Sequence, residues 1–116
     1  MKIIIPYHLT ASAGDSGFVE LLTVPAGMKL TILKTQIYFP IGTYGELQLA
    51  LYYGESKIAP YTGYWSGDGC MFTDEMESSW SGGDVIKLYY NNTNDTETRE
   101  AFLLITAELE LSLIHI

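Results

Sequence analysis

Apolar and polar residues alternate one by one along two segments of this sequence, residues 46–53 and 99–111. Every second residue of the longer segment is apolar: Ala101, Leu103, Ile105, Ala107, Leu109 and Leu111. The shorter segment has the same period, with Leu47, Leu49, Leu51 and Tyr53. A period of two puts one side of a β-strand in a core and the other side in water. No segment of useful length has the 3.6-residue period of a helix, so the sequence predicts an all-β fold.

Short turn sequences separate further segments that are rich in β-branched and aromatic residues. The run VPAG at residues 24–27 has Pro and Gly where a tight turn prefers them, and Gly-rich breaks follow at residues 40–45, 66–69 and 81–84. We expect strands at residues 3–10, 17–24, 28–39, 46–53, 57–61, 70–77, 84–91 and 99–111. This spacing predicts a single domain, residues 1–116, folded as an antiparallel, jelly-roll-like β-sandwich of about eight strands.

The apolar pattern changes phase inside the segment 28–39. Leu30 and Ile32 share one face of a regular strand, whereas Leu33, Ile37 and Phe39 share the other. A β-bulge or a bend between two sheets, near Leu33 and Lys34, would reconcile the two halves.

Acidic residues outnumber basic ones by fourteen to six, which gives a formal net charge of −8. Nucleic acids and anionic membrane surfaces both bind through Lys and Arg, so the composition argues against both partners. Such a charge ordinarily serves solubility, and cation binding is the alternative. Oxygen ligands on Gly-rich loops suit Ca²⁺, and the candidate ligands are Asp68, Asp74, Glu75, Glu77 and Asp84. Their spacing does not match an EF-hand loop, and we expect no cofactor.

The residues needed for nucleophilic catalysis are scarce in this sequence. His8 and His115 are the two imidazoles, and His8 lies in a predicted strand, where packing or exposure is its ordinary role. Cys70 is the single cysteine, so no intrachain disulfide is possible, and its apolar neighbours favour a buried thiol. The adjacent carboxylates of residues 74–77 are typical of a solvated edge strand. The sequence therefore predicts a protein that is not an enzyme.

Tyrosine and tryptophan carry the candidate binding chemistry. Tyr61, Tyr64 and Trp65 occupy a predicted loop, and two Tyr pairs, at residues 52–53 and 89–90, occupy strands. Adjacent strand residues face opposite ways, so one Tyr of each pair points outward, and we take Tyr52 and Tyr90 as candidates. Exposed aromatic residues can anchor a protein interface or stack on sugars, whereas cross-strand packing on a sheet surface is the structural alternative.

The two ends of the chain and one loop carry further signals. Residues 1–6 lack the features of a signal peptide, and no apolar run is long enough to span a bilayer, so we expect synthesis in the cytoplasm without membrane insertion. Residues 111–116, LSLIHI, resemble the translated sequencing-adapter tail of metagenomic contigs, and the alternative is an extension of the last strand. Asn91 and Asn94 each begin an N-glycosylation pattern in a polar loop, where we expect turn-forming roles first.

Two longer runs carry a resemblance to a known class of proteins. Residues 24–32, VPAGMKLTI, and residues 82–91, GGDVIKLYYN, resemble the strand–turn pattern of small β-sandwich virion proteins of prokaryotic viruses. The resemblance implies a jelly-roll-like subunit of a symmetric or spike-like assembly, and it transfers no functional residue.

Two functions follow as competing hypotheses. The first is a non-enzymatic structural subunit of a virion or extracellular surface assembly, which associates with copies of itself or with other structural subunits through Tyr-rich sheet faces and loops. The second is a carbohydrate- or receptor-binding module, in which Ca²⁺ assists binding. The mass in solution distinguishes them, because an assembly subunit is oligomeric.

Overall fold

The computed structural model describes residues 1–112 as eight β-strands joined by loops. The strands are β1 (Lys2–Ala11), β2 (Ser16–Thr23), β3 (Met28–Phe39), β4 (Leu47–Tyr53), β5 (Ser56–Ala59), β6 (Cys70–Ser81), β7 (Val85–Asn92) and β8 (Arg99–Leu111). In this part of the chain, no helix has the length and apolarity needed to cross a membrane. His115 and most of the adapter-like tail lie outside the described residues.

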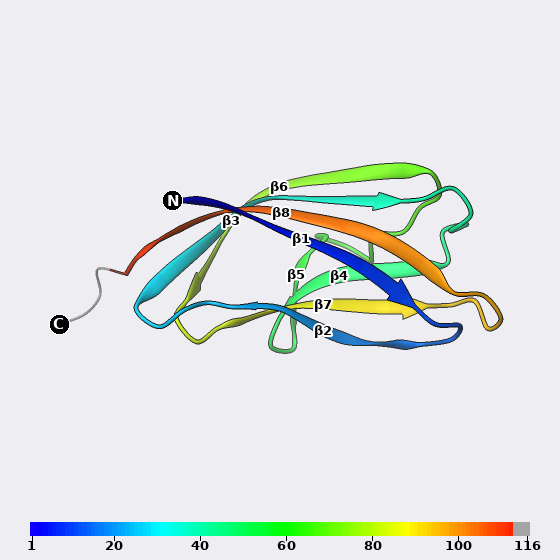
Figure 1. The fold of residues 1–116 in the computed structure, drawn as a ribbon, viewed down its shortest axis with the longest axis horizontal. Helices are drawn as coiled ribbons and strands as arrows, with labels where there is room; N and C mark the ends of the chain where they lie inside the picture. The colour runs from blue at the N-terminus through cyan, green and yellow to red at the C-terminus, as the bar shows by residue number, and fades with distance from the viewer. Residues whose placement is uncertain (113–116) are drawn as a thin grey trace.

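The strands form two antiparallel four-stranded sheets that pack face to face (Figure 1). Sheet A has the order β1-β8-β3-β6, and sheet B has the order β2-β7-β4-β5. Every connection between consecutive strands passes from one sheet to the other, except the β4–β5 hairpin. This is the strand order of a jelly roll built from two Greek keys. The predicted all-β sandwich is confirmed.

The core lies between the sheets and is formed by the alternating residues of each strand. Leu49 and Leu51 of sheet B face Leu103 and Ile105 of sheet A, and all four are buried, as the alternation predicts. Burial of apolar area contributes roughly 25 cal/mol per Å². A chain without a disulfide depends on this term for its stability.

β3 contains the predicted bulge. Its register shifts between Ile32 and Lys34 against both neighbours. Leu33 is the extra residue against β8, whereas β6 places two residues, Met76 and Glu77, opposite Leu33. The shift lets Leu30 and Ile32 before it, and Ile37 and Phe39 after it, face the same core, and all four are fully buried. The phase change therefore reflects one continuous strand with an inserted residue.

Two strand ends differ from those expected by more than one residue. β5 ends at Ala59 rather than residue 61, because Pro60 has no N–H to continue the ladder with β4. β6 continues to Ser81 rather than residue 77, because Trp80 pairs with Leu30 and is buried in the core. The sequence did not predict this extension, because residues 78 and 79 are polar and interrupt the apolar pattern.

Candidate assembly surfaces

Four aromatic rings from four segments of the chain form one cluster on the outer face of sheet B. We call this cluster the aromatic face. Phe18 of β2 contacts Tyr52 of β4 and Tyr89 of β7, with ring centroids 5.2 and 5.4 Å apart. Tyr89 also lies 5.9 Å from Tyr52 and 5.4 Å from Tyr64, which comes from the loop after β5. The cluster therefore spans three strands and a loop.

Strand alternation determines which residues enter the aromatic face. Leu51 and Leu88 are fully buried, so their neighbours Tyr52 and Tyr89 point to the outer side of sheet B. Partial burial raises the pKa of both phenols, and the neighbouring Tyr64 raises it further. These hydroxyls are neutral at physiological pH and act as hydrogen-bond donors at the edge of an apolar surface.

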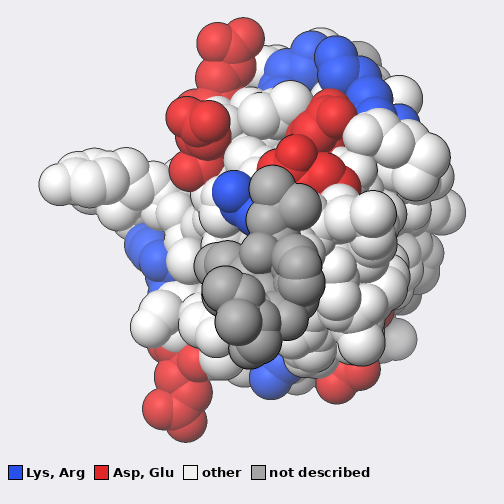
Figure 2. Space-filling model, turned by 90° about the vertical axis from the view of Figure 1, so that its left-hand side faces the viewer, with Lys and Arg blue, Asp and Glu red and all other residues white. Residues whose placement is uncertain are grey.

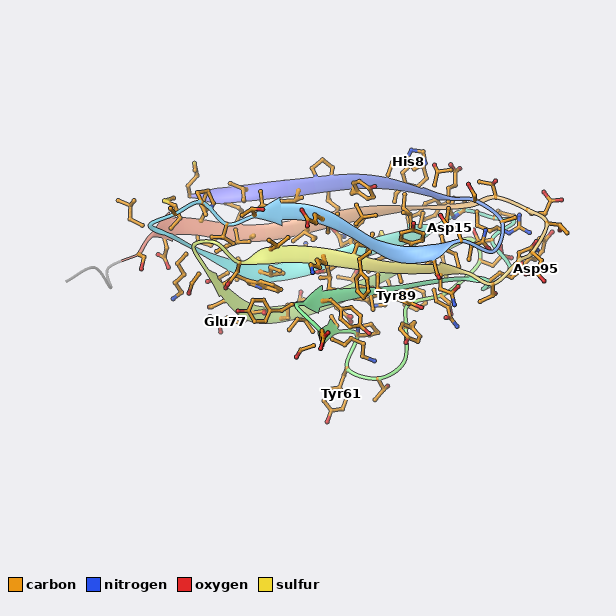
Figure 3. All side chains as sticks on the ribbon, turned by 90° about the horizontal axis from the view of Figure 1, so that it is seen from below. His8, Asp15, Tyr61, Glu77, Tyr89 and Asp95 are labelled. Atoms are coloured by element: carbon orange, nitrogen blue, oxygen red, sulfur yellow. The ribbon has the colours of Figure 1, made fainter. Side chains whose placement is uncertain are left out.

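The loop between β5 and β6 carries Tyr61 away from the body of the sandwich, on the side opposite to His8 (Figure 3). Its side chain is 98% exposed. The amine of Lys57 donates a hydrogen bond to the carbonyl of Gly63 in this loop at 2.7 Å and lies 5.4 Å from the centre of the Tyr64 ring. The loop thus presents one free ring at its tip and anchors a second one at its base.

Two candidate residues have positions other than those expected. Trp65 is 4% exposed and belongs to the core, because an isolated bridge to Leu49 draws this end of the loop under the sheet. Its indole Nε1 donates to Asp74 Oδ2 at 2.8 Å. Tyr90 is the inward member of its pair, packs against the core and donates its hydroxyl to Asp15 at 3.2 Å. The expectation that Trp65 and Tyr90 offer free outer rings is therefore corrected, and Tyr89 is the outward residue.

The five acidic residues considered for Ca²⁺ have separate structural roles. Asp68 Oδ1 accepts hydrogen bonds from the backbone N–H groups of Gly42, Thr43 and Tyr44, and these bonds, that of Gly42 foremost, lower the pKa of its carboxyl. Glu75 and Glu77 point outward from edge strand β6. Two further carboxylates bond to side chains or turns, namely Asp74 to Trp65 and Asp84 to Ser81 N and the Tyr53 hydroxyl.

Residues 1–112 contain no group of three or more His, Cys, Asp or Glu side chains that could hold a metal ion. The structure therefore does not bring the five candidates together. Figure 2 shows acidic and basic side chains in small separate groups on the end of the molecule that faces the viewer.

The outer face of sheet A carries a second exposed apolar surface. One row of residues crosses all four strands in register: His8 on β1, Phe102 on β8, Tyr38 on β3 and Met71 on β6. We call it the apolar row. The His8 ring stacks on Phe102 with centroids 4.4 Å apart, and its Nε2 lies 2.9 Å from Glu100 Oε2. A shallow hollow of about 470 Å³ lies over this row and the neighbouring Pro6 and Leu104.

The imidazole and the thiol of the described chain lie far apart. His8 is on β1 and faces outward, whereas Cys70 begins β6, pairs with buried Phe39 and points inward. These strands are the opposite edges of sheet A. Three strand spacings of about 4.8 Å separate them, which is too far for a Cys–His pair.

The polar loop between β7 and β8 is held together by its asparagines. Asn94 Oδ1 accepts bonds from the N–H groups of Thr96 and Glu97, and its Nδ2 donates to both oxygens of Glu46 at 3.1 Å. Arg99 also donates to Glu46, at 3.0 Å. The amide of Asn94 thus has the turn-forming role that the sequence suggested.

The fold is similar to that of solved β-sandwich proteins from phage capsids. A chain in the acidic stable capsid of Helicobacter pylori bacteriophage KHP30 has a TM-score of 0.55 and 16% identity, over 95% of this chain and 97% of that one. A chain in the capsid asymmetric unit of cyanophage Pam1 has a TM-score of 0.52 and 10% identity, over 91% of this chain and 83% of that one. The predicted resemblance to virion β-sandwich proteins is therefore confirmed at the level of the fold. Neither a protein-family model nor a curated protein sequence matches the chain.

Proposed function

We propose that this chain is a non-enzymatic structural subunit of a virion or other extracellular assembly, and that it associates with further copies through the aromatic face and the Tyr61 loop. The observation that carries this proposal is the aromatic face, in which Phe18 and Tyr64 are exposed and Tyr52 and Tyr89 are half-buried between them. The outer face of a solvent-exposed antiparallel sheet is normally polar. Contiguous exposed aromatic residues instead mark contact surfaces, where Tyr, Trp and Phe are enriched.

The fold supports this role. Two solved chains of similar fold, with TM-scores of 0.55 and 0.52, belong to phage capsids. A jelly roll leaves its two outer sheet faces and its end loops free for contacts, and in this chain both outer faces carry exposed aromatic rings. The acidic charge argues against nucleic acid as a partner.

The arrangement of reactive groups supports a role without catalysis. His8 is held by Glu100 and Phe102 at one edge of sheet A, and the Cys70 thiol faces the interior at the other edge. Nucleophilic catalysis requires a nucleophile and a base within hydrogen-bond reach. The carboxylates of residues 68, 74 and 84 are engaged by backbone or side-chain donors.

A carbohydrate-binding module is the second candidate, and one groove favours it. A groove of about 350 Å³ lies between the Tyr61 loop and edge strand β6, and Asp74, Glu75 and Glu77 line it. An aromatic ring beside carboxylate acceptors suits the faces and hydroxyls of a sugar. On the aromatic face itself, the rings meet at interplanar angles of 35–84°, so they pack on one another and form no flat stacking platform.

Sedimentation velocity on three proteins tests the proposal. We expect the wild-type chain to sediment as an oligomer, and Phe18→Ser with Tyr89→Ser to weaken association while the circular-dichroism spectrum stays that of a β protein. Tyr61→Ala removes the free ring at the loop tip and should weaken association as well. A wild-type monomer whose Trp or Tyr fluorescence responds to a panel of oligosaccharides would refute the structural role and favour the binding module.

A further inference from the structure

The outer face of sheet A has an alternating pattern of charge from strand to strand. The outward residues of β8 include Glu100, Glu108 and Glu110, and those of its neighbour β3 include Lys29 and Lys34. At the edges, β1 has outward Lys2, and β6 has outward Glu75 and Glu77. The strands of sheet A therefore read basic, acidic, basic and acidic in the order β1-β8-β3-β6.

This alternation makes the face complementary to itself under one symmetry operation. We propose that a second copy of this chain docks on the outer face of sheet A about a twofold axis that runs parallel to the strands, between β8 and β3. The inference rests on the proposed function and adds a second contact, on the face opposite to the aromatic face. A twofold interface uses the same patch on both subunits, so each residue must fit its symmetry mate.

The axis exchanges strands of opposite charge. It sets acidic β8 against basic β3 of the second copy, where Lys29 and Glu110 lie in register and face each other. It also sets basic β1 against acidic β6, where Lys2 faces Ser79, two residues from Glu77. Lys29 and Glu110, which lie 3.9 Å apart in one copy, each then face the strand that carries the other sign. An axis perpendicular to the strands would set each strand against itself, glutamates of β8 on glutamates of β8, and like charges in contact cost several kcal/mol.

The same twofold operation places the apolar row of one copy opposite the apolar row of the other copy. Phe102 faces Tyr38 of the second copy, and His8 faces Met71. The centre of the contact is thus aromatic on aromatic, and a methionine sulfur meets the imidazole at each side. Phe102 and Tyr38 are each 42% exposed, and Met71 is 59% exposed, so these side chains have area left to bury.

The size of the face is sufficient for a specific dimer. Four strands spaced about 4.8 Å apart give a width of roughly 19 Å, and the ten residues of β1 give a length of roughly 34 Å. The face therefore covers roughly 650 Å², and two copies together bury roughly 1,300 Å², which lies within the range of specific interfaces. The apolar row supplies its centre, and the charged residues of the other rows form its rim.

A pair of single charge substitutions tests this geometry directly. Phe102→Glu and Tyr38→Lys should each raise the Kd of this contact at least about 30-fold, the effect of losing one hot-spot residue. When the two variants are mixed, one of the two symmetry-related contacts sets the introduced carboxylate against the introduced ammonium, and the other is native. The mixture should therefore regain the sheet A contact, which neither variant makes alone. Phe18→Glu adds the same charge to the opposite face and should leave this contact intact.

A second measurement tests the same contact if either charge variant fails to fold. In a Cys70→Ser background, Tyr38→Cys and Phe102→Cys proteins are mixed and treated with a short bis-maleimide, which should join the two different chains within the oligomer. An oligomer mass that Phe102→Glu leaves unchanged would overturn the twofold contact alone. So would a mixture of the two charge variants that does not regain the contact, or the absence of cross-linking. A wild-type chain that sediments as a monomer would overturn the proposed function together with it.

Discussion

Thr35 provides the sharpest test of the packing, because its hydroxyl is buried without a partner. The side chain points into the core between Ile105 of β8 and Asp74 of β6, and it is fully buried. Within the described residues, its Oγ1 has no hydrogen-bond partner. An unsatisfied buried polar group costs about 1–3 kcal/mol. Thr35→Val replaces the hydroxyl with a methyl group of similar shape, so it should raise the free energy of unfolding by about that amount.

Thr31 on the same strand is the matched control. It is also buried, but its Oγ1 lies 3.2 Å from Ser79 Oγ, so Thr31→Val removes a hydrogen bond and should lower stability by about 1 kcal/mol. Urea denaturation followed by far-ultraviolet circular dichroism gives both values, with the m-value as a check on two-state unfolding. Equal effects of the two substitutions, or a lower midpoint for Thr35→Val, would refute the assignment of an unpaired hydroxyl in the core.

Three further substitutions have expected outcomes. Leu103→Ala should cost about 2–5 kcal/mol in thermal or urea unfolding, because Leu103 lies between the sheets; a loss below about 1 kcal/mol would contradict that position. Trp65→Ala should lower the melting temperature far more than Tyr61→Ala, because the indole is buried and bonded to Asp74 whereas the Tyr61 ring is free; similar melting temperatures would be incompatible with a buried indole. Asp68 has a pKa below that of the unfolded chain, so its contribution to stability is present above the unfolded pKa and is lost as the pH falls through the folded pKa. Asp68→Asn should therefore reduce the acid dependence of the melting temperature, and an unchanged pH profile would argue against the backbone hydrogen bonds that Asp68 accepts from residues 42–44.

Local patterns were sufficient to predict much of the fold. The alternation in β4 and β8 assigned the core positions of Leu49, Leu51, Leu103 and Ile105, because side chains in a regular strand alternate strictly between its two faces. The phase change around Leu33 predicted the bulge for the same reason. The alternation and the phase change can each be recognised within a single segment, and neither requires knowledge of the neighbouring strands.

The candidate site depended on information that a single segment does not contain. Phe18 joins the aromatic face because β2 pairs with β7, so that it lies directly opposite Tyr89. Trp65 is buried in the core and is not a free ring, because its backbone pairs with Leu49, sixteen positions earlier in the chain. Strand order and long-range bridges are tertiary properties, and the alternation in β7 was the one local signal that could have selected Tyr89 over Tyr90, through buried Leu88.

We propose above that this sandwich uses its outer faces to associate with copies of itself. Multi-angle light scattering of the wild-type chain over a range of micromolar concentrations tests it most directly, against a chain mass of 12.9 kDa. We expect a weight-average mass that rises with concentration toward an integral multiple of the chain mass. A constant mass of one chain at every concentration would contradict it.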